Sequence, residues 1–447
     1  MPASHRPAKT ARSLANTWAN TWATTWAATL ALALATPAAW AQAPTFKLGF
    51  VTFLSGPAAE SFGVPAGNSA KLMVEQFNKG TAPAPYNQKG FGGLPIEMIM
   101  VDEAGGAAKQ VQEMRNLYQR ENVDAIVGYI GSGDCLAVAP AAEELKKFLV
   151  LMDCGTPRIF EDAAPKYVFR TASHAAMDNI TLARYLKSRN VAVDSFNLIN
   201  QDYAWGQDSR ADFLAAMSQL YPRALPGADL LPKFGAGQYG TEISALAAKP
   251  ATLTYSSLWG GDLQAFVLQA GARGTLKDTT LVLSAADHVL PGLLDKMPDG
   301  TILGARGAYG ILSAKNPLND WFQGAHQQSF SVPPVQAAYR VAQSLMGLKL
   351  AVERAMAKNG GKKPSAEEMA DALRGSSWES PAGTIRMTLG NGQQAIQSTA
   401  IGRTKYDAAS KRVIATDIQT FPAECVNPPA GVKALDWIKA GMQGAKC

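Results

Sequence analysis

The chain has 447 residues, enough for two domains of ordinary size, and a formal net charge of +6. Lys and Arg number 42 against 36 Asp and Glu, so the positive excess is small and both signs are spread along the chain. Because no run of Lys and Arg is long enough to follow a phosphate backbone, the composition argues against a nucleic-acid-binding protein.

The first 41 residues have the features of a signal peptide. Three basic residues occur among the first 12, no acidic residue precedes Glu60, and an apolar run occupies 27–35. Ala39-Trp40-Ala41 is a small-x-small site, which predicts cleavage near Ala41 and export to the periplasm. A membrane span needs about 20 apolar residues, more than this run supplies, and the alternatives are an uncleaved anchor or a disordered leader.

After the leader, short apolar strands alternate with helices. Strands are expected at 46–53, 96–101, 125–130, 148–153, 195–200, 252–257, 280–284 and 301–308. Helical spacing is expected at 64–77, 107–121, 136–147, 175–188, 207–220 and 261–270. Such alternation is typical of parallel sheets covered on both faces. The predicted fold class is α/β, with two doubly wound parallel-sheet lobes joined by a multi-strand hinge.

The alternation is long enough for two sheets, and we expect a lobe around each. Lobe 1 is expected to comprise 42–171 and 307–375, and lobe 2 to comprise 172–306 and 376–424. The candidate crossings between lobes are 169–171, 306–308 and the region near 381–383. One long helix is predicted over 336–358 because its apolar residues fall on one face. The Gly- and Pro-rich segment 80–93 is predicted to be a surface loop.

The four cysteines are Cys135, Cys154, Cys425 and Cys447. An even number in an exported chain suggests disulfides, and four cysteines allow three pairings. Proximity in sequence favours Cys135–Cys154 and Cys425–Cys447, the second of which would close a C-terminal tail over 425–447. Metal binding is the alternative, although these cysteines lack the paired CxxC spacing of zinc sites. Whether Cys154 is bridged or free at a binding site stays open.

Three predicted strand ends, at 54–58, 131–134 and 153–156, carry small polar or Gly residues at the sheet edge where ligands of open parallel sheets bind. Ser132 and Thr156 offer hydroxyl groups next to helix N-termini, an environment that suits a ligand carboxylate. Helix capping by the same two side chains is an equal alternative.

Larger side chains follow the later strands. Tyr203, Trp205 and Trp259 are expected either to wall a cleft or to join the core. Asp287 is placed to pair with a ligand ammonium group, and the alternative for it is a helix N-cap.

Motifs of catalysis and cofactor binding are missing from the sequence. There is no HExxH, no G-x-S-x-G and no GxxxxGK[ST]. His174, His288 and His326 share no metal-ligand spacing, so we expect neither a metal nor another cofactor, and no enzymatic activity.

Several segments, in their order and spacing, resemble the periplasmic branched-chain amino-acid-binding (Leu/Ile/Val-binding-like) family of ABC importers. The matching segments are Leu54–Ala58, Val127–Ser132, Phe169–Thr171, Asp202–Gly206 and the Ala338-Tyr339 pair that opens the long helix. The resemblance covers nearly the whole chain after the leader. It implies a type I periplasmic-binding fold, capture of a ligand by hinge closure, and a membrane permease as the partner of a monomeric protein.

The resemblance also implies a binding site. The residues placed to hold the α-carboxylate of a ligand are Ser132, Cys154 and Thr156. Trp205 stands where an aromatic of the family's D-x-x-[YF]-G motif contacts the ligand. Asp287 is the match for the residue that receives the ammonium, and Phe62 borders the side-chain pocket. Trp205 is larger than the family's Tyr and Asp287 shorter than its Glu, which extends the candidate ligands to other amino acids, amides and aromatic carboxylates.

The expected function is therefore the extracytoplasmic solute-binding component of an ABC importer for a small carboxylate-bearing ligand, an amino acid or a related compound. One alternative is a ligand-sensing receptor domain of the same fold, against which we note that no membrane helix or signalling module is expected after the second lobe. The other is an exported hydrolase, against which the scarcity of histidine counts.

Overall fold

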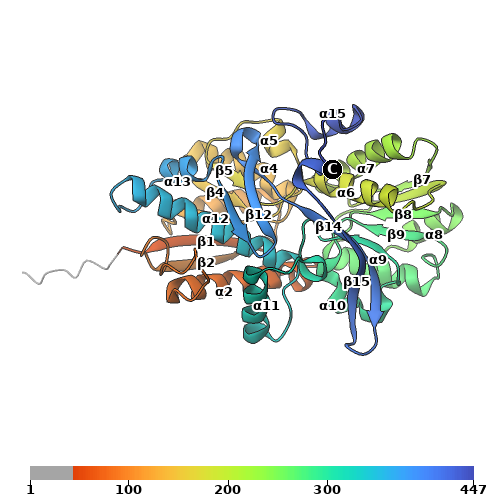
Figure 1. Ribbon diagram of the computed structural model, residues 1–447, viewed down its shortest axis with the longest axis horizontal. Coiled ribbons are helices and arrows are strands. Elements are labelled where there is room, and N and C mark those ends of the chain that lie inside the picture. The colour runs from red at the N-terminus through yellow and green to blue at the C-terminus, as the bar shows by residue number, and fades with distance from the viewer. Residues whose placement is uncertain (1–43) are drawn as a thin grey trace, which may run out of the picture. The chain divides into compact units, whose positions relative to one another are not determined.

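The computed structural model describes residues 44–447, and the predicted signal peptide lies outside the described residues. Two sheets with helices packed around them form the fold (Figure 1). The eight-stranded sheet has the order β11-β12-β13-β5-β4-β3-β1-β2, and the seven-stranded sheet has the order β15-β14-β10-β9-β8-β6-β7. The predicted α/β class with two parallel-dominated lobes is confirmed.

The eight-stranded sheet forms lobe 1. Its strands are β1 (Phe46–Thr52), β2 (Ile96–Asp102), β3 (Ala125–Gly128), β4 (Phe148–Leu151), β5 (Val168–Arg170), β11 (Ser377–Ser380), β12 (Gly383–Leu389) and β13 (Gln394–Ile396). Its helices are η1 (Ala59–Gly63), α2 (Val64–Lys79), α3 (Ala107–Gln119), α4 (Ser132–Leu145), α5 (Arg158–Glu161), α11 (Pro317–Phe330), α12 (Gln336–Lys358) and α13 (Ala366–Leu373). Strands β1 to β5 run parallel, and the almost continuously buried residues of β1, β3, β4 and β5 explain why the sequence shows them as apolar runs, whereas the edge strand β2 is only partly buried.

The seven-stranded sheet forms lobe 2. Its strands are β6 (Ser195–Ile199), β7 (Leu225–Leu230), β8 (Leu253–Ser256), β9 (Thr280–Leu283), β10 (Ile302–Gly304), β14 (Thr399–Asp407) and β15 (Arg412–Phe421). The helices of this half are α6 (Ala175–Ser188), α7 (Ala204–Leu220), α8 (Gly240–Ala248), α9 (Gly260–Ala272), η2 (Asp287–Val289), α10 (Leu290–Leu293), η3 (Leu294–Lys296), η4 (Gly310–Leu312), α14 (Ala423–Val426) and α15 (Ala434–Lys439). Strands β14 and β15 pair antiparallel.

One boundary differs from the sequence-based division. The segment 376–424, expected in lobe 2, is shared between the sheets, because β11, β12 and β13 extend the first sheet and only β14 and β15 extend the second. The third crossing accordingly lies between β13 and β14, near Gln397, and not near 381–383. Strands β11 and β12 alternate buried and more exposed residues, as antiparallel strands with one wet face do, so they lack the apolar runs that identify the parallel strands.

A single glutamine connects the three crossings between the lobes. Gln343 of α12 donates through Nε2 to the carbonyl of Thr171 and, at 3.1 Å, to Oε1 of Gln397. Its Oε1 accepts a hydrogen bond of 2.9 Å from the hydroxyl of Tyr309, which in turn accepts one from Gln397 Nε2 at 2.6 Å. Because each crossing contributes one partner, the hinge strands are held together at one point.

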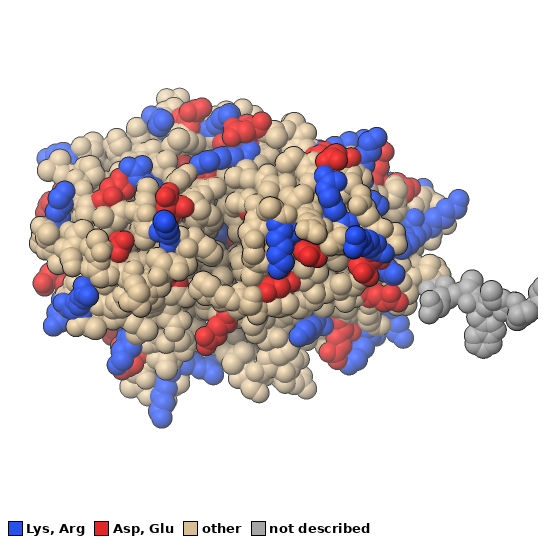
Figure 2. All heavy atoms as spheres, turned by 180° about the vertical axis from the view of Figure 1, so that it is seen from behind, with Lys and Arg blue, Asp and Glu red and all other residues tan. Residues whose placement is uncertain are grey.

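Other sequence-based expectations can be compared directly with the structure. The helix predicted over 336–358 is α12. The predicted loop 80–93 contains no helix or strand. Lys349 of α12 anchors this loop by donating to the carbonyls of Gln88 at 2.7 Å and Gly90 at 2.6 Å. The disulfides Cys135–Cys154 and Cys425–Cys447 are both formed. No helix within 44–447 combines the length and apolarity needed to cross a membrane. Charges of both signs are interspersed over the face shown in Figure 2.

Candidate functional site

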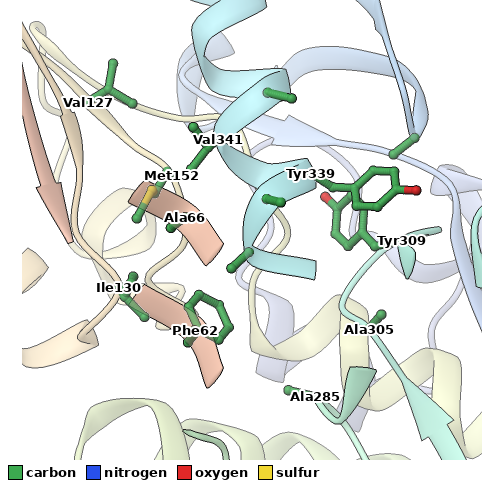
Figure 3. Close-up of a cluster of buried hydrophobic side chains, with 14 of the residues drawn as sticks. Phe62, Ala66, Val127, Ile130, Met152, Ala285, Ala305, Tyr309, Tyr339 and Val341 are labelled. Carbon is green, nitrogen blue, oxygen red and sulfur yellow. The ribbon is translucent and has the colours of Figure 1, made fainter. Parts of the chain in front are cut away.

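The carboxyl ends of the strands of both sheets meet around a small cavity between the lobes. Its lining residues are Phe62, Ile130, Asp153, Gly155, Tyr203, Trp205, Trp259, Ala285, Arg306 and Gln336. Most of them lie just after a strand, where an open parallel sheet exposes its helix N-termini and loops. Figure 3 shows Phe62 and Ile130 of lobe 1 on one side of the site and Ala285 and Ala305 of lobe 2 on the other. The cavity measures about 10 Å³, roughly the room that one water needs, so the lobes are closed on each other.

Arg306, directly after β10, is the cation of this site. It is 6 % exposed, and its guanidinium lies 4.1 Å from the ring centroid of Trp205, an arrangement that favours a cation–π interaction. Its Nε donates to Asp178 at 2.8 Å, its Nη2 to the carbonyl of Ser173 at 3.0 Å, and its Nη1 pairs with Asp153. A guanidinium carries five N–H donors, so two of them, one on each terminal nitrogen, are left for another acceptor.

Asp153, directly after the fourth strand, supplies the opposite charge. Its Oδ1 accepts from Arg306 and, at 2.5 Å, from Nη1 of Arg340 on α12. Its Oδ2 is buried without a hydrogen-bond partner among residues 44–447. Since Asp153 belongs to lobe 1 and Arg306 follows a strand of lobe 2, their ion pair connects the lobes across the cavity.

Aromatic side chains make most of the remaining wall. The Phe62 ring meets Trp259 edge-on, with centroids 5.4 Å apart, and Trp259 Nε1 donates to the Tyr203 hydroxyl at 2.7 Å. Trp205 is fixed by a 2.9 Å hydrogen bond from its Nε1 to the carbonyl of Ser257, which leaves its ring lying against Gly155. A side chain at position 155 would overlap the Trp205 ring, so glycine is required for this contact. The wall therefore offers flat apolar faces, one of which, the Trp205 ring, lies against Arg306.

Two further polar groups face or border the cavity. Both polar atoms of the Gln336 side-chain amide, at the start of α12, are buried without a partner among the described residues. His288 lies behind Phe62, with ring centroids 5.0 Å apart, and its Nε2 accepts a hydrogen bond from the backbone N–H of Gly260 at 2.8 Å. Burial lowers the pKa of His288 to about 3, so its ring is neutral and adds no charge to the site.

Comparison with known proteins places this geometry in a family. The model of the family described as periplasmic binding protein matches residues 45–411, most of the chain. The chain belongs to the periplasmic binding protein family. No curated protein matches its sequence.

Solved structures with 16–21 % sequence identity share the fold of this periplasmic binding protein. A solute binding protein of an ABC transporter from Rhodopseudomonas palustris BisB5, in complex with 3,4-dihydroxybenzoic acid, has 21 % identity and a TM-score of 0.71, and covers 85 % of this chain and 98 % of its own. Another from R. palustris, in complex with benzoate, has 17 % identity and a TM-score of 0.72, covering 87 % and 99 %. The branched-chain amino acid transporter substrate binding protein LivJ from Streptococcus pneumoniae, in complex with isoleucine, has 16 % identity and a TM-score of 0.69, covering 84 % and 100 %.

The residues predicted to bind ligand in this periplasmic binding protein separate into two groups. Those that line the cavity are Phe62, Tyr203, Trp205 and Trp259. Those that lie outside its lining are Ser132, Cys154, Thr156 and Asp287. The structure thus brings together the aromatic candidates and places the small and acidic candidates behind them.

The second group is occupied by contacts within the protein. Ser132 Oγ accepts from the backbone N–H of Thr156 at 3.2 Å, the Thr156 hydroxyl accepts from the N–H of Arg158 at 3.3 Å, and Cys154 is bridged. Asp287 accepts from the backbone N–H of Ile311 at 3.1 Å and from that of Gln336, the first residue of α12, at 2.8 Å. Burial raises the Asp287 pKa to about 6, and these two hydrogen bonds limit the rise.

Sequence reasoning missed the polar centre of the site. Arg306 was considered only as part of a crossing, and Asp153 and Gly155 lay in the strand-end segment 153–156 without being chosen. The one available indication was position, because Asp153 ends a predicted strand and Gly155 follows it next to Thr156. Nothing in the sequence distinguishes Gln336 from other residues that open a helix. Within 44–447, no cluster of three or more His, Cys, Asp or Glu side chains is arranged to hold a metal ion.

Proposed function

We propose that the protein is the exported solute-binding component of an ABC importer and that its inter-lobe cleft captures a small carboxylate-bearing compound without changing it chemically. The observation that carries this proposal is Arg306, a buried guanidinium with two uncommitted N–H donors that lies against the Trp205 ring. Guanidinium groups bind carboxylates with paired, charge-assisted hydrogen bonds, so an anionic head group is the matching ligand chemistry.

The rest of the wall favours an aromatic carboxylate with a hydroxyl group, such as 4-hydroxybenzoate. Phe62, Trp205 and Trp259 offer stacking surfaces suited to a ring. The amide of Gln336, which lines the cavity and has no hydrogen-bond partner among the described residues, provides an acceptor for a hydroxyl donor at another point of the ligand. Asp287, the residue expected to receive an amino-acid ammonium, already accepts two backbone hydrogen bonds, which makes an aliphatic amino acid the weaker candidate.

Calorimetric titration with 4-hydroxybenzoate, benzoate and leucine tests both the solute-binding function and the assignment of an aromatic ligand. We expect 4-hydroxybenzoate to bind most tightly and benzoate more weakly, because benzoate leaves the Gln336 amide unpaired. Leucine as the only binder would overturn the aromatic assignment and leave the solute-binding function standing. Turnover of a bound compound, followed by mass spectrometry, would overturn the binding function itself.

The partners follow from the same proposal. We expect a membrane permease to recognise the closed form and the protein to be a monomer in solution. Co-purification with the permease in the presence of ligand tests the first expectation, and light scattering of the purified protein tests the second. Co-purification with a membrane kinase would instead favour the receptor alternative.

A further inference from the structure

A second, larger cavity lies behind the binding loop and is closed by the C-terminal tail. Its volume is about 440 Å³, within the range of small-molecule sites. The floor is formed by Arg170 and His174, and the walls include Phe160 of α5 and Leu389 at the end of β12. Part of the wall is the tail segment 428–433, which lies beyond the residues 45–411 that match the family. We call this space the tail cavity.

The floor of the tail cavity holds a guanidinium that is not fully used. Arg170 is completely buried; it donates through Nη1 to the carbonyls of Cys154 and Thr156 and through Nε to Gln394, and it lies 5.3 Å from the Phe160 ring centroid. Its Nη2 has no hydrogen-bond partner among residues 44–447. A buried donor without a partner costs about 1–3 kcal/mol, so an acceptor that enters the cavity beside Nη2 would be stabilised there.

A second buried polar atom on the floor also lacks a hydrogen-bond partner. His174 is 2 % exposed, and its Nδ1 lacks a partner within the described residues. Burial and the charges of Arg170 and Arg306 lower the His174 pKa to about 3, so the ring is neutral and its tautomer can adjust to a ligand. Two unpaired polar atoms therefore line one floor, below a mostly apolar wall.

The acidic groups nearby limit the charge of a ligand. Glu161 accepts from the backbone N–H of Ala434 at 2.9 Å, and Asp162 pairs with Lys433 at 2.6 Å. These two carboxylates balance the charges of Arg170 and Lys433, which disfavours a dianion such as phosphate. A singly charged head group attached to an apolar body matches the floor and the walls together.

We propose that the tail cavity binds a small organic monocarboxylate, with Arg170 Nη2 and the His174 imidazole contacting its head group and Phe160 and Leu389 contacting its body. The site is distinct from the inter-lobe cleft and does not depend on the function proposed for the cleft. The two sites share the loop 153–158, because Arg170 holds the carbonyls of Cys154 and Thr156 while Asp153 and Gly155 line the cleft.

Crystals soaked with 4-bromobenzoate test the proposal, since the anomalous signal of bromine locates each bound molecule. We expect a bromine peak in the tail cavity of the wild-type protein, in addition to any peak in the cleft. Ala164→Trp, at an exposed position in the cavity lining, is chosen to occupy the tail cavity while leaving Arg170 and His174 unchanged. Ala409→Trp, at an exposed position in the turn between β14 and β15, is the matched control.

Native mass spectrometry supplies the solution measurement. Ala164→Trp is expected to bind one fewer 4-bromobenzoate per chain than the wild type, and Ala409→Trp the same number as the wild type. Absence of bromine from the tail cavity, or equal binding by the two variants, overturns the proposal. Binding of inorganic phosphate in place of 4-bromobenzoate would overturn the assignment to an organic monocarboxylate.

Discussion

Replacing Arg306 by glutamine removes the cation of the cleft and should lower both folding stability and ligand affinity. The structure allows these two effects to be separated. In Arg306→Gln, Asp153 keeps Arg340 as its partner, whereas Asp178 keeps only a 3.1 Å hydrogen bond from the hydroxyl of Ser173. An aspartate that is 3 % exposed is then left without a counter-charge. Breaking a buried ion pair from one side costs about 3–5 kcal/mol of folding free energy. Loss of a charged hydrogen bond to a ligand costs about 1.5–3 kcal/mol, or about a 10- to 150-fold increase in Kd.

The double variant Arg306→Gln/Asp178→Asn separates these effects because it also removes the stranded charge. We expect urea unfolding to show most of the lost stability recovered in the double variant, while calorimetry with 4-hydroxybenzoate shows ligand affinity still reduced. Recovery of both stability and affinity would refute the reasoning, since Arg306 would then support the cleft only through the ion-pair network.

The pH dependence of the single variant provides an independent check. Burial raises the pKa of Asp178 above its ordinary value, and the charge of Arg306 opposes that rise. Without Arg306 the pKa rises further, so the folded state binds more protons than the unfolded state over a wider pH range. Stability of Arg306→Gln therefore falls as pH increases from about 4 toward neutrality, more steeply than that of the wild type. A parallel pH profile for the two proteins would contradict this account.

Three further predictions concern Gly155 in the loop after β4, the buried Asp134 of α4, and the disulfide of the C-terminal tail. Gly155→Ala is expected to raise the Kd for 4-hydroxybenzoate at least about tenfold and to enlarge the radius of gyration in X-ray scattering, because the added Cβ would overlap the Trp205 ring. The control Gly133→Ala, with no atom within 4 Å of the added Cβ, should change neither the Kd nor the radius of gyration. Burial raises the Asp134 pKa to about 6, so wild-type stability should fall by up to about 3 kcal/mol as pH rises from 4 to 7, and Asp134→Asn should flatten that part of the urea-unfolding profile. Replacing Cys425 and Cys447 together by serine opens a loop with a sequence separation of 22 and should cost about 3 kcal/mol in urea unfolding; an unchanged midpoint would mean that the tail is held by packing alone.

Most of the fold was predictable because its parallel strands are buried on both faces. Runs such as 125–128 and 148–151 are apolar throughout and are recognisable without a structure. The antiparallel strands were missed because β12 alternates buried and exposed residues and resembles ordinary surface sequence. Their position in the first sheet depends on β13 pairing with β5, a contact between residues more than 200 positions apart that no local pattern encodes.

The candidate site was predictable to a similar extent, and for related reasons. Aromatic residues that follow strands are visible in the sequence, and four of them line the cavity. The charged centre was not visible, because the pair Arg306–Asp153 joins residues 153 positions apart. Arg306 also adopts a left-handed backbone conformation, with φ 58°, as do Tyr129 and Cys154 after β3 and β4. This conformation is uncommon for residues other than glycine, and it reflects tertiary constraint at strand ends that propensity does not report.

The contacts that close the lobes also constrain how the cleft can work. Arg306 pairs with Asp153 across the lobes, Arg158 pairs with Asp208 at 2.5 Å, and the Gly261 N–H donates to the Pro57 carbonyl at 2.9 Å. With about 10 Å³ left between them, a ring the size of benzoate enters only if the lobes separate or Trp205 and Arg306 move. A ligand carboxylate can accept from the two uncommitted N–H groups of Arg306 while Asp153 keeps its contacts with Arg306 and Arg340, so a bound ligand adds to the inter-lobe contact. Since a ligand shifts such an equilibrium only by its differential affinity for the two states, its affinity and the stability of the closed form depend on the same guanidinium.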